Sequence, residues 1–182
     1  MIETFTKSFI KNERYRTLDI GCGDSMIGDC RIDITRDSAA TELALATKMP
    51  YKNESFDYMN AANVLEHQPN PLEFLLECKR VLKKNGTFKI ITDNAGYHGW
   101  FPFLNKFQDI HGTYANPRTN KDKHYMIFTL SHLKNLLELA GFEILLLELF
   151  TRWNPTLFQR VRTMINPNIG RSHILVYARI AK

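Results

Sequence analysis

The feature that most constrains the fold is a glycine turn, LDIGCGDS at residues 18–25, placed between two short runs of β-type residues. The first run, Tyr15–Ile20, stops at Gly21, and the second, RIDI, covers Arg31–Ile34. Glycine lets the backbone adopt positive φ and approach a ligand closely. In an α/β sheet, a turn that leaves the first strand lies at the carboxyl edge, where ligands bind. We therefore predict a ligand-binding turn at a sheet edge.

Signals for strands and helices alternate further along the chain. Asn70 can cap a helix whose first residue is Pro71, and Asn85-Gly86 is expected to end it. The other predicted segments are strands at Phe56–Asn60, 87–92, 142–150 and 172–180, a helix capped by Thr129 and stopped by Gly141, and a short basic helix at 156–165. This alternation predicts a mostly parallel α/β sheet.

Length and composition favour a single domain over residues 1–182, because the chain is 44% hydrophobic and contains no Pro/Gly/Ser-rich linker. Residues 93–126 are expected to form an acceptor-side lid or insertion, and 151–172 a basic insertion before the last strand. No apolar stretch reaches the roughly 20 residues of a membrane span. The first residues have no secretory pattern, so we expect a cytoplasmic protein. The three cysteines, Cys22, Cys30 and Cys78, lack a CxxC spacing and are expected to be free thiols.

The spacing of the glycines bears on which ligand the turn binds. A dinucleotide-binding turn reads G-x-G-x-x-G, whereas here Gly21 and Gly23 are followed by Met26 in place of the third glycine. This lowers the case for NAD. Asp33, at the end of the second strand, is suited to accept hydrogen bonds from both ribose hydroxyls of a nucleoside. The alternative for Asp33 is a cap of its own turn.

Five segments in order resemble the class I S-adenosylmethionine-dependent methyltransferases of the small type 11 family, from about Thr17 to Ile144. They are LDIGCG, RIDI, ATKMPYKNESFDYMNAANVLEH, PLEFLLECKRVLKKNGTFKIITDN and HYMIFTLSHLKNLLELAGFEI. The resemblance implies a Rossmann-like, seven-stranded, mostly parallel sheet with helices on both faces and an antiparallel last strand. It also implies S-adenosyl-L-methionine as the cofactor and methyl transfer as the reaction.

The resemblance also implies roles for particular residues. The expected cofactor contacts are Asp19, Gly21, Cys22 and Gly23 at the methionine part, Asp33 and Ile34 at the ribose, Ala46 and Thr47 at the adenine, and Ala62 and Asn63 beneath the sulfonium. Carboxylates such as Asp19 attract an ammonium group, which agrees with this placement.

The sequence departs from the family pattern in two places. Leu45 stands where an acid usually accepts from the adenine amine, so adenine recognition is expected to rest on backbone groups and apolar packing. Only nine residues separate Gly23 from Asp33, so the first crossover helix is expected to be short or absent.

The candidate catalytic residues on the acceptor side are His67, His111, His124 and Tyr125, each suited to act as a base or to orient an acceptor. For His67 the alternative is that it orders its loop through Glu66. No metal site is expected, because His98, His111 and His124 lie 13 residues apart each.

The charge of +5 is concentrated towards the carboxyl end, where residues from Leu149 onward include six basic groups and no acid. This pattern favours an anionic partner or a solvated basic face. The apolar side of the helix at 156–165, formed by Leu157, Phe158, Val161 and Ile165, is expected to pack on the sheet or on a second subunit. A homodimer is therefore a further expectation. The methyl acceptor is expected to be a small or lipid-linked molecule, with nucleic acid as an open alternative.

Three functions remain in competition at this point. The leading hypothesis is a methyltransferase that uses S-adenosyl-L-methionine. The first alternative is a non-catalytic binding protein of the same fold that acts through its basic C-terminal surface. The second, weakened by Met26, is an NAD-dependent oxidoreductase.

Overall fold

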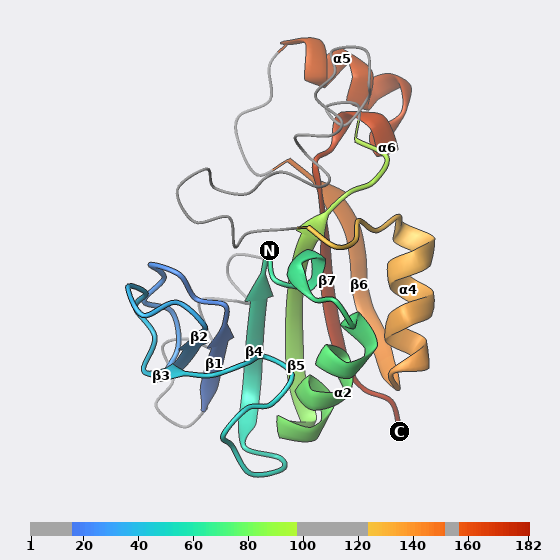
Figure 1. The fold of residues 1–182 in the computed structure, drawn as a ribbon. Coiled ribbons are helices and arrows are strands. Elements are labelled where there is room, and N and C mark those ends of the chain that lie inside the picture. The colour runs from blue at the N-terminus through green and yellow to red at the C-terminus, as the bar shows by residue number, and fades with distance from the viewer. Residues whose placement is uncertain (1–15, 98–123, 152–156) are drawn as a thin grey trace.

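The computed structural model describes residues 16–97, 124–151 and 157–182 (Figure 1). The elements follow in chain order: β1 (Thr17–Ile20), β2 (Cys30–Asp33), β3 (Glu42–Leu43), β4 (Phe56–Ala62), the 3₁₀ helix η1 (Leu65–His67), α2 (Pro71–Val81), β5 (Leu82–Asp93), α4 (Leu130–Leu139), β6 (Phe142–Phe150), α5 (Leu157–Ile165), α6 (Pro167–Gly170) and β7 (His173–Ile180).

The strands form one seven-stranded sheet in the order β3-β2-β1-β4-β5-β7-β6. The strands from β3 to β5 are parallel, whereas β7 runs antiparallel to both β5 and β6. The chain order reverses at β1, which has β2 on one side and β4 on the other, and this is the switch point at which α/β sheets bind ligands. The predicted mostly parallel, Rossmann-like sheet with an antiparallel last strand is confirmed.

The connection from β1 to β2 contains no helix: residues 21–29 form only turns, bends and irregular chain. This confirms the short first crossover. Its physical cause is length: the few residues after Gly23 reach β2 directly, and Ala39 and Thr41 then hydrogen-bond back to Gly23 and Arg31.

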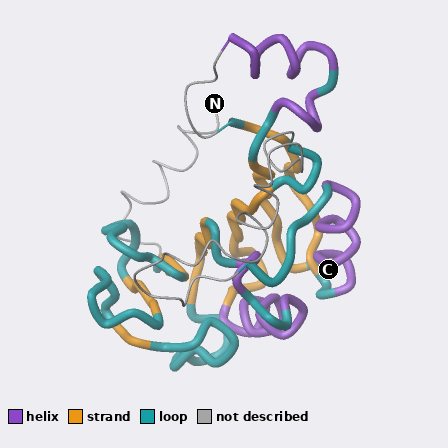
Figure 2. Tube along the Cα trace, turned by 45° about the horizontal axis from the view of Figure 1, so that its top comes forward, coloured by secondary structure: helices purple, strands orange, loops and turns teal. Residues whose placement is uncertain are grey.

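The main core lies between the sheet and two helices, α2 and α4, which cover one of its faces (Figures 1 and 2). Phe74, Leu75 and Cys78 of α2 and Leu133 and Leu137 of α4 are fully buried against it. A smaller cluster with Tyr58, Leu175 and Tyr177 at its centre lies apart from this core. Within the described residues, no helix is both long and apolar enough to cross a bilayer.

The helix α2 begins as predicted and ends earlier. Asn70 caps it by accepting from the backbone NH of Glu73, and Pro71 is its first residue. We expected the helix to continue to Asn85-Gly86, but it ends at Val81. Leu82 is fully buried and pairs with Phe56, so burial at the start of β5 overrides the helical tendency of the following lysines.

The segment between β6 and β7 lies beyond the upper ends of these strands and carries α5 and α6 (Figure 1). Asn94, directly after β5, holds it in place: its side-chain amide donates to the carbonyls of Asn168 and Arg171 at 2.8 and 2.7 Å. We expected the apolar side of α5 to pack on the sheet or on a second subunit; the sheet does not cover it, because Leu157, Val161 and Ile165 are exposed. Its contacts are with α6, where Thr163 lies against Gly170.

Candidate cofactor and acceptor site

The glycine turn after β1 has the backbone conformation that its sequence requires. Gly21 and Gly23 have φ of 61° and 52°. A Cβ on Gly21 would lie 2.5 Å from Val64 Cγ2, so the side chain of Val64, two residues after β4, packs directly on the glycine. A Cβ on Gly23 would meet no atom within 4 Å. The turn is therefore closed on the Gly21 side and open at Gly23, where a ligand has room to approach the backbone.

Asp19 is a buried carboxylate directly before this turn, with 2% of its surface exposed. Its Oδ1 accepts from Asn60 Nδ2 at 2.6 Å, while its Oδ2 is buried without a hydrogen bond. Burial raises the pKa of Asp19, and the nearby side chains of Asn60 and Ser25 oppose this only in part. A buried acceptor with unused capacity fits a cationic ligand group such as an ammonium.

Asp33, at the end of β2, lies beside the same turn. Its Oδ2 accepts from the backbone NH of Gly23 at 2.9 Å, and its Oδ1 accepts from the NH of Thr35 at 2.8 Å. Each carboxylate oxygen retains a second lone pair, so Asp33 both caps its turn and keeps acceptor capacity for a diol. Ile34, the next residue, is 67% exposed.

The predicted adenine segment forms a turn between β3 and β4. Leu45 and Lys48 pair across this turn, with Ala46 and Thr47 half-buried between them. Leu45 itself is 60% exposed and supplies no acceptor. Arg80 of α2 anchors the chain that follows.

Arg80 makes several hydrogen bonds to that chain, donating to the carbonyls of Met49 and Tyr51 and to Asn53 Oδ1 at 2.7–3.1 Å. Glu77, one turn earlier in α2, accepts from Arg80 and from the backbone NH of Met49. The bond from Arg80 lowers the pKa of Glu77 and keeps it ionised.

The carboxyl end of β4 provides the floor of the site. Ala62 ends the strand, and Asn63 follows with φ of 57°, a conformation that Asn tolerates better than most residues. The side-chain amide of Asn63 donates to Glu66 Oε1 at 2.9 Å, and its backbone NH donates to Ile91.

Glu66 is a fully buried carboxylate that the sequence reasoning did not assign to the site. Its Oε2 accepts from Thr92 Oγ1 at 2.9 Å, and its backbone carbonyl accepts from the NH groups of Tyr125 and Met126. Burial raises the pKa of Glu66, against the opposing effect of these hydrogen bonds. One residue thus ties the end of β4, the end of β5 and the segment before α4 together.

Asp93, the last residue of β5, lies between two histidines. Its Oδ2 is 3.3 Å from His124 Nδ1, and its Oδ1 is 3.6 Å from His173 Nε2. His67 packs edge-on against His124, with ring centroids 4.5 Å apart. His173 in turn shares a 2.6 Å hydrogen bond with Ser172.

The structure brings two of the four predicted catalytic residues together, His67 and His124. Tyr125 is 57% exposed and reaches Glu66 through its backbone NH. His111 lies outside the described residues, as does most of the predicted lid. Cys22 is buried in the turn, and this burial raises the pKa of its thiol, which keeps it neutral.

Sequence reasoning missed Asp93 and His173 as members of this cluster. Asp93 directly follows the apolar run KIIT, which is the position where a strand delivers a side chain to the carboxyl edge. His173 opens the antiparallel strand β7, and its proximity to Asp93 follows from the β5–β7 register. In the described part of the chain, no group of three His, Cys, Asp or Glu side chains is arranged to hold a metal.

Residues 14–90 match the model of the "Methyltransferase domain" family. This part of the chain is similar to the class I methyltransferases of the type 11 family. The 3-2-1-4-5-7-6 strand order extends this likeness over the whole sheet. This likeness implies S-adenosyl-L-methionine as the cofactor, and the residues fit it, because Gly23 is open and Asp19 Oδ2 has acceptor capacity to spare.

Known proteins resemble this chain in sequence and in fold. A ubiquinone biosynthesis O-methyltransferase of Glaesserella parasuis serovar 5 (strain SH0165) is 32% identical, with 43% of this chain and 45% of the relative covered. The match thus spans less than half the length of that curated relative.

Solved structures share the fold over nearly the whole chain. A SAM-dependent methyltransferase of Methanosarcina mazei has a TM-score of 0.67 at 17% identity, with 97% of each chain covered. A [4+2]-cyclase has a TM-score of 0.66 at 16% identity, with 98% of this chain and 80% of the cyclase covered. At these identities the likeness establishes the fold alone.

Proposed function

We propose that this methyltransferase domain transfers a methyl group from S-adenosyl-L-methionine to a hydroxyl oxygen of a small or lipid-linked acceptor. The observation that carries the proposal is the pair formed by Asp93 and His124, which lies at the same sheet edge as the glycine turn. The Glaesserella relative is an O-methyltransferase, which supports oxygen as the acceptor atom.

The residues around the turn would hold the cofactor in an extended pose across the switch point. Asp19 would accept from its ammonium, Asp33 from its ribose hydroxyls, and the half-buried Ala46 and Thr47 would face its adenine. When bound, the cofactor supplies an electrophilic methyl group on a sulfonium sulfur. Val64 packs on Gly21, so the turn and the η1 segment with His67 form one continuous wall.

The histidine pair would act on the acceptor. Nδ1 of His124 lies 3.3 Å from Asp93 Oδ2, so the carboxylate would favour the tautomer with its proton on Nδ1 and leave Nε2 as the acceptor for the substrate's hydroxyl proton. With the cofactor bound, His124 would take up and hold the hydroxyl proton, and the acceptor oxygen would be free to receive the methyl group that the sulfonium supplies. Asp93 stabilises the resulting imidazolium, and His67 restricts the ring's orientation.

The cofactor and acceptor parts of the proposal are tested separately. Calorimetric titration with S-adenosylhomocysteine should show binding that weakens about tenfold or more in Asp33→Ala, since charge-assisted hydrogen bonds contribute roughly 1.5–3 kcal/mol. Failure of wild type to bind would remove the methyltransferase function. Binding without transfer to any of a panel of phenols, catechols and amines would favour the non-catalytic alternative.

The acceptor chemistry is tested with His124→Gln. Loss of a general base should lower kcat about 10²- to 10⁴-fold and abolish the acid limb of the pH–rate profile. Binding of S-adenosylhomocysteine should change little. His132→Gln is the matched control, because this exposed histidine lies on α4 away from the cluster. Equal activity of the two variants would remove His124 from the mechanism.

A further inference from the structure

The helix α5 presents an apolar stripe to solvent. Leu157, Val161, Met164 and Ile165 recur at positions i, i+4, i+7 and i+8, so they share one side of the helix. They are exposed to 79%, 47%, 86% and 76%. The attachment to the rest of the molecule uses a different side, where Thr163 lies against Gly170 of α6. The stripe is therefore an outward surface.

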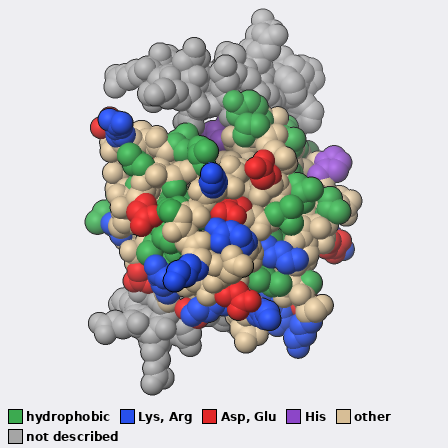
Figure 3. Space-filling view, turned by 60° about the horizontal axis from the view of Figure 1, so that its bottom comes forward, with side chains coloured by type: hydrophobic (Ala, Val, Ile, Leu, Met, Phe, Trp, Pro, Cys, Tyr) green, Lys and Arg blue, Asp and Glu red, His purple; other side chains and the backbone are tan. Residues whose placement is uncertain are grey.

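The charge around this stripe has one sign. Residues 157–172 contain Arg160, Arg162 and Arg171 and no acidic residue. Arg160 is exposed, whereas Arg171 donates to the carbonyl of Leu149 at 2.6 Å. The opposite end of the molecule differs, because there Lys and Arg side chains are interspersed with Asp and Glu (Figure 3).

We infer that α5 docks this protein on the surface of an anionic lipid bilayer. An apolar helical stripe combined with arginines is the pattern of a helix that lies in the interface plane, with its apolar side among the acyl chains and its cations near anionic headgroups. This inference goes beyond the proposed function and does not depend on it.

The charge argues against two other occupants of the stripe. A second copy docked α5 to α5 would bring two basic segments together, and residues 157–172 supply no acid to compensate. A nucleic acid backbone would engage the arginines and leave the four apolar side chains in water. A bilayer of anionic lipid uses both features.

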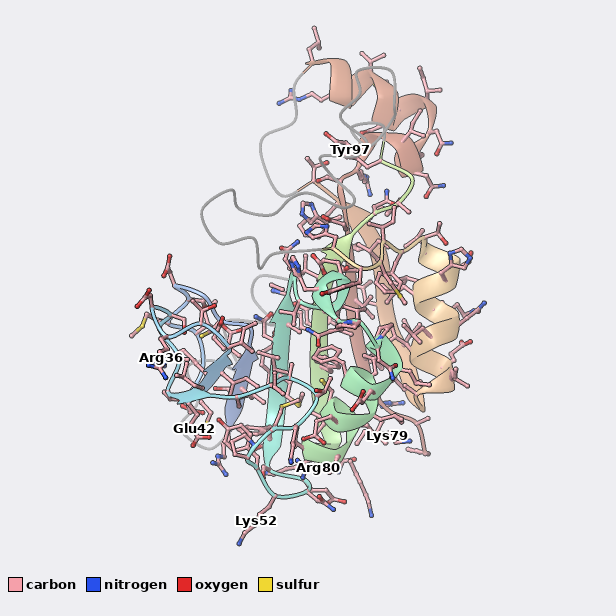
Figure 4. The ribbon with its side chains drawn as sticks, in the orientation of Figure 1. Arg36, Glu42, Lys52, Lys79, Arg80 and Tyr97 are labelled. Atoms are coloured by element: carbon pink, nitrogen blue, oxygen red, sulfur yellow. The ribbon has the colours of Figure 1, made fainter. Side chains whose placement is uncertain are left out.

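The position of α5 gives the docking a direction. Asn94 holds α6 at the carboxyl end of β5, one residue beyond Asp93, and Tyr97 lies at the same end of the sheet (Figure 4). Lys52 and Arg80 lie at the opposite end (Figure 4). A membrane bound to α5 therefore faces the end of the molecule that carries the candidate acceptor site.

The test is co-sedimentation of the full chain with vesicles of phosphatidylcholine alone or mixed with phosphatidylglycerol. We expect binding to the mixed vesicles only, weakening as NaCl is raised. Met164→Glu should weaken binding about tenfold or more, since it places a charge in the stripe. Arg160→Gln should weaken it about fivefold, the loss expected for one basic group near an anionic surface.

Leu139→Glu is the matched control, because Leu139 is 71% exposed but lies on α4. The Leu139→Glu variant should bind vesicles as well as wild type does. Because Met164 and Leu139 are both exposed, thermal melts of the two variants should match wild type. Absence of binding to the mixed vesicles, or equal binding by Met164→Glu and Leu139→Glu, overturns the inference.

Two further outcomes assign the stripe to another occupant and equally overturn it. The first is a wild-type dimer in gel filtration that Met164→Glu converts to monomer, without vesicle binding. The second is binding to mixed-sequence RNA that Arg160→Gln weakens and Met164→Glu does not.

Discussion

The buried carboxylate of Asp19 lowers the stability of the ligand-free protein but favours binding of a cationic ligand. Its carboxylate is buried with one oxygen unpartnered, and burial raises its pKa. A charge in such a place destabilises the protein without ligand and becomes favourable only beside a cation.

We predict that, at pH values above the pKa of Asp19, Asp19→Asn raises the melting temperature of the ligand-free protein. The same substitution should weaken S-adenosylhomocysteine binding about tenfold or more. Thermal melts and calorimetry on the same samples provide the measurement. The two effects have opposite signs, so a variant that loses both stability and binding would contradict this assignment.

Gly21 and Gly23 allow a matched comparison within one turn. Both have positive φ, which costs a non-glycine residue about 1–2 kcal/mol. Alanine at 21 also meets Val64 at 2.5 Å, whereas alanine at 23 meets nothing.

Gly21→Ala should therefore lower the free energy of unfolding by about 2 kcal/mol or more. Gly23→Ala should lower it by about 1–2 kcal/mol and mainly reduce cofactor binding, because its methyl group enters the open side of the turn. Urea unfolding and ligand titration distinguish them, and equal loss of stability would show that the contact with Val64 relaxes freely.

At the scale of elements, α2 supports the cofactor site through Arg80 rather than through packing alone. Arg80→Lys cannot keep the forked hydrogen bonds to Met49, Tyr51 and Asn53. We predict faster hydrogen exchange of the backbone amides over residues 45–54. Binding of S-adenosylhomocysteine should weaken about three- to tenfold, because each lost hydrogen bond costs about 1 kcal/mol.

Lys84→Ala is the control for this prediction. Lys84 follows α2, and its exposed ion pair with Glu54, at 3.9 Å, should contribute about 0–1 kcal/mol. If the amides of residues 45–54 exchange no faster in Arg80→Lys than in Lys84→Ala, the anchoring role of Arg80 is wrong.

The elements that sequence predicts well are those with a local signal. Asn70 and Thr129 mark helix starts because their side chains cap backbone NH groups a few residues away, and Gly141 marks a helix end because it adopts φ of 85°. The end of α2 has no such signal, since burial of Leu82 against a distant strand decides it.

The site divides in the same way. Asp19, Gly23 and Asp33 lie within one short segment, so their proximity could be predicted from spacing, and Asp33 does hydrogen-bond to Gly23. Asp93 and His173 come together only through the β5–β7 register, which pairs residues far apart in the chain. The exposure of α5 likewise depended on tertiary packing, because amphipathic periodicity does not say what covers the apolar side.

At the scale of the whole molecule, Glu66 makes stability depend on pH. Its folded pKa is raised above its ordinary value of 4.5, so the folded protein holds the proton more tightly than the unfolded chain. The associated stability is complete below about 4.5 and is lost as pH rises through the raised pKa.

Glu66→Gln removes this titration while keeping an acceptor for Asn63. The variant should therefore gain in melting temperature relative to wild type as pH rises above about 4.5. Parallel thermal melts from acid to neutral pH check this, and a difference that is constant with pH would contradict it.

The position of β7 has a consequence for how the sheet assembles. β7 is the last strand in the chain, yet it lies between β5 and β6 and is almost entirely buried. β6 is hydrogen-bonded within the sheet to β7 alone, so it gains a partner only when residues 173–180 arrive. Such distant pairing is slow, because the chain must close a long loop before the contacts form. Until residues 173–180 take their place, one edge of β5 stays exposed and β6 has no partner in the sheet, so this half of the sheet forms late in folding.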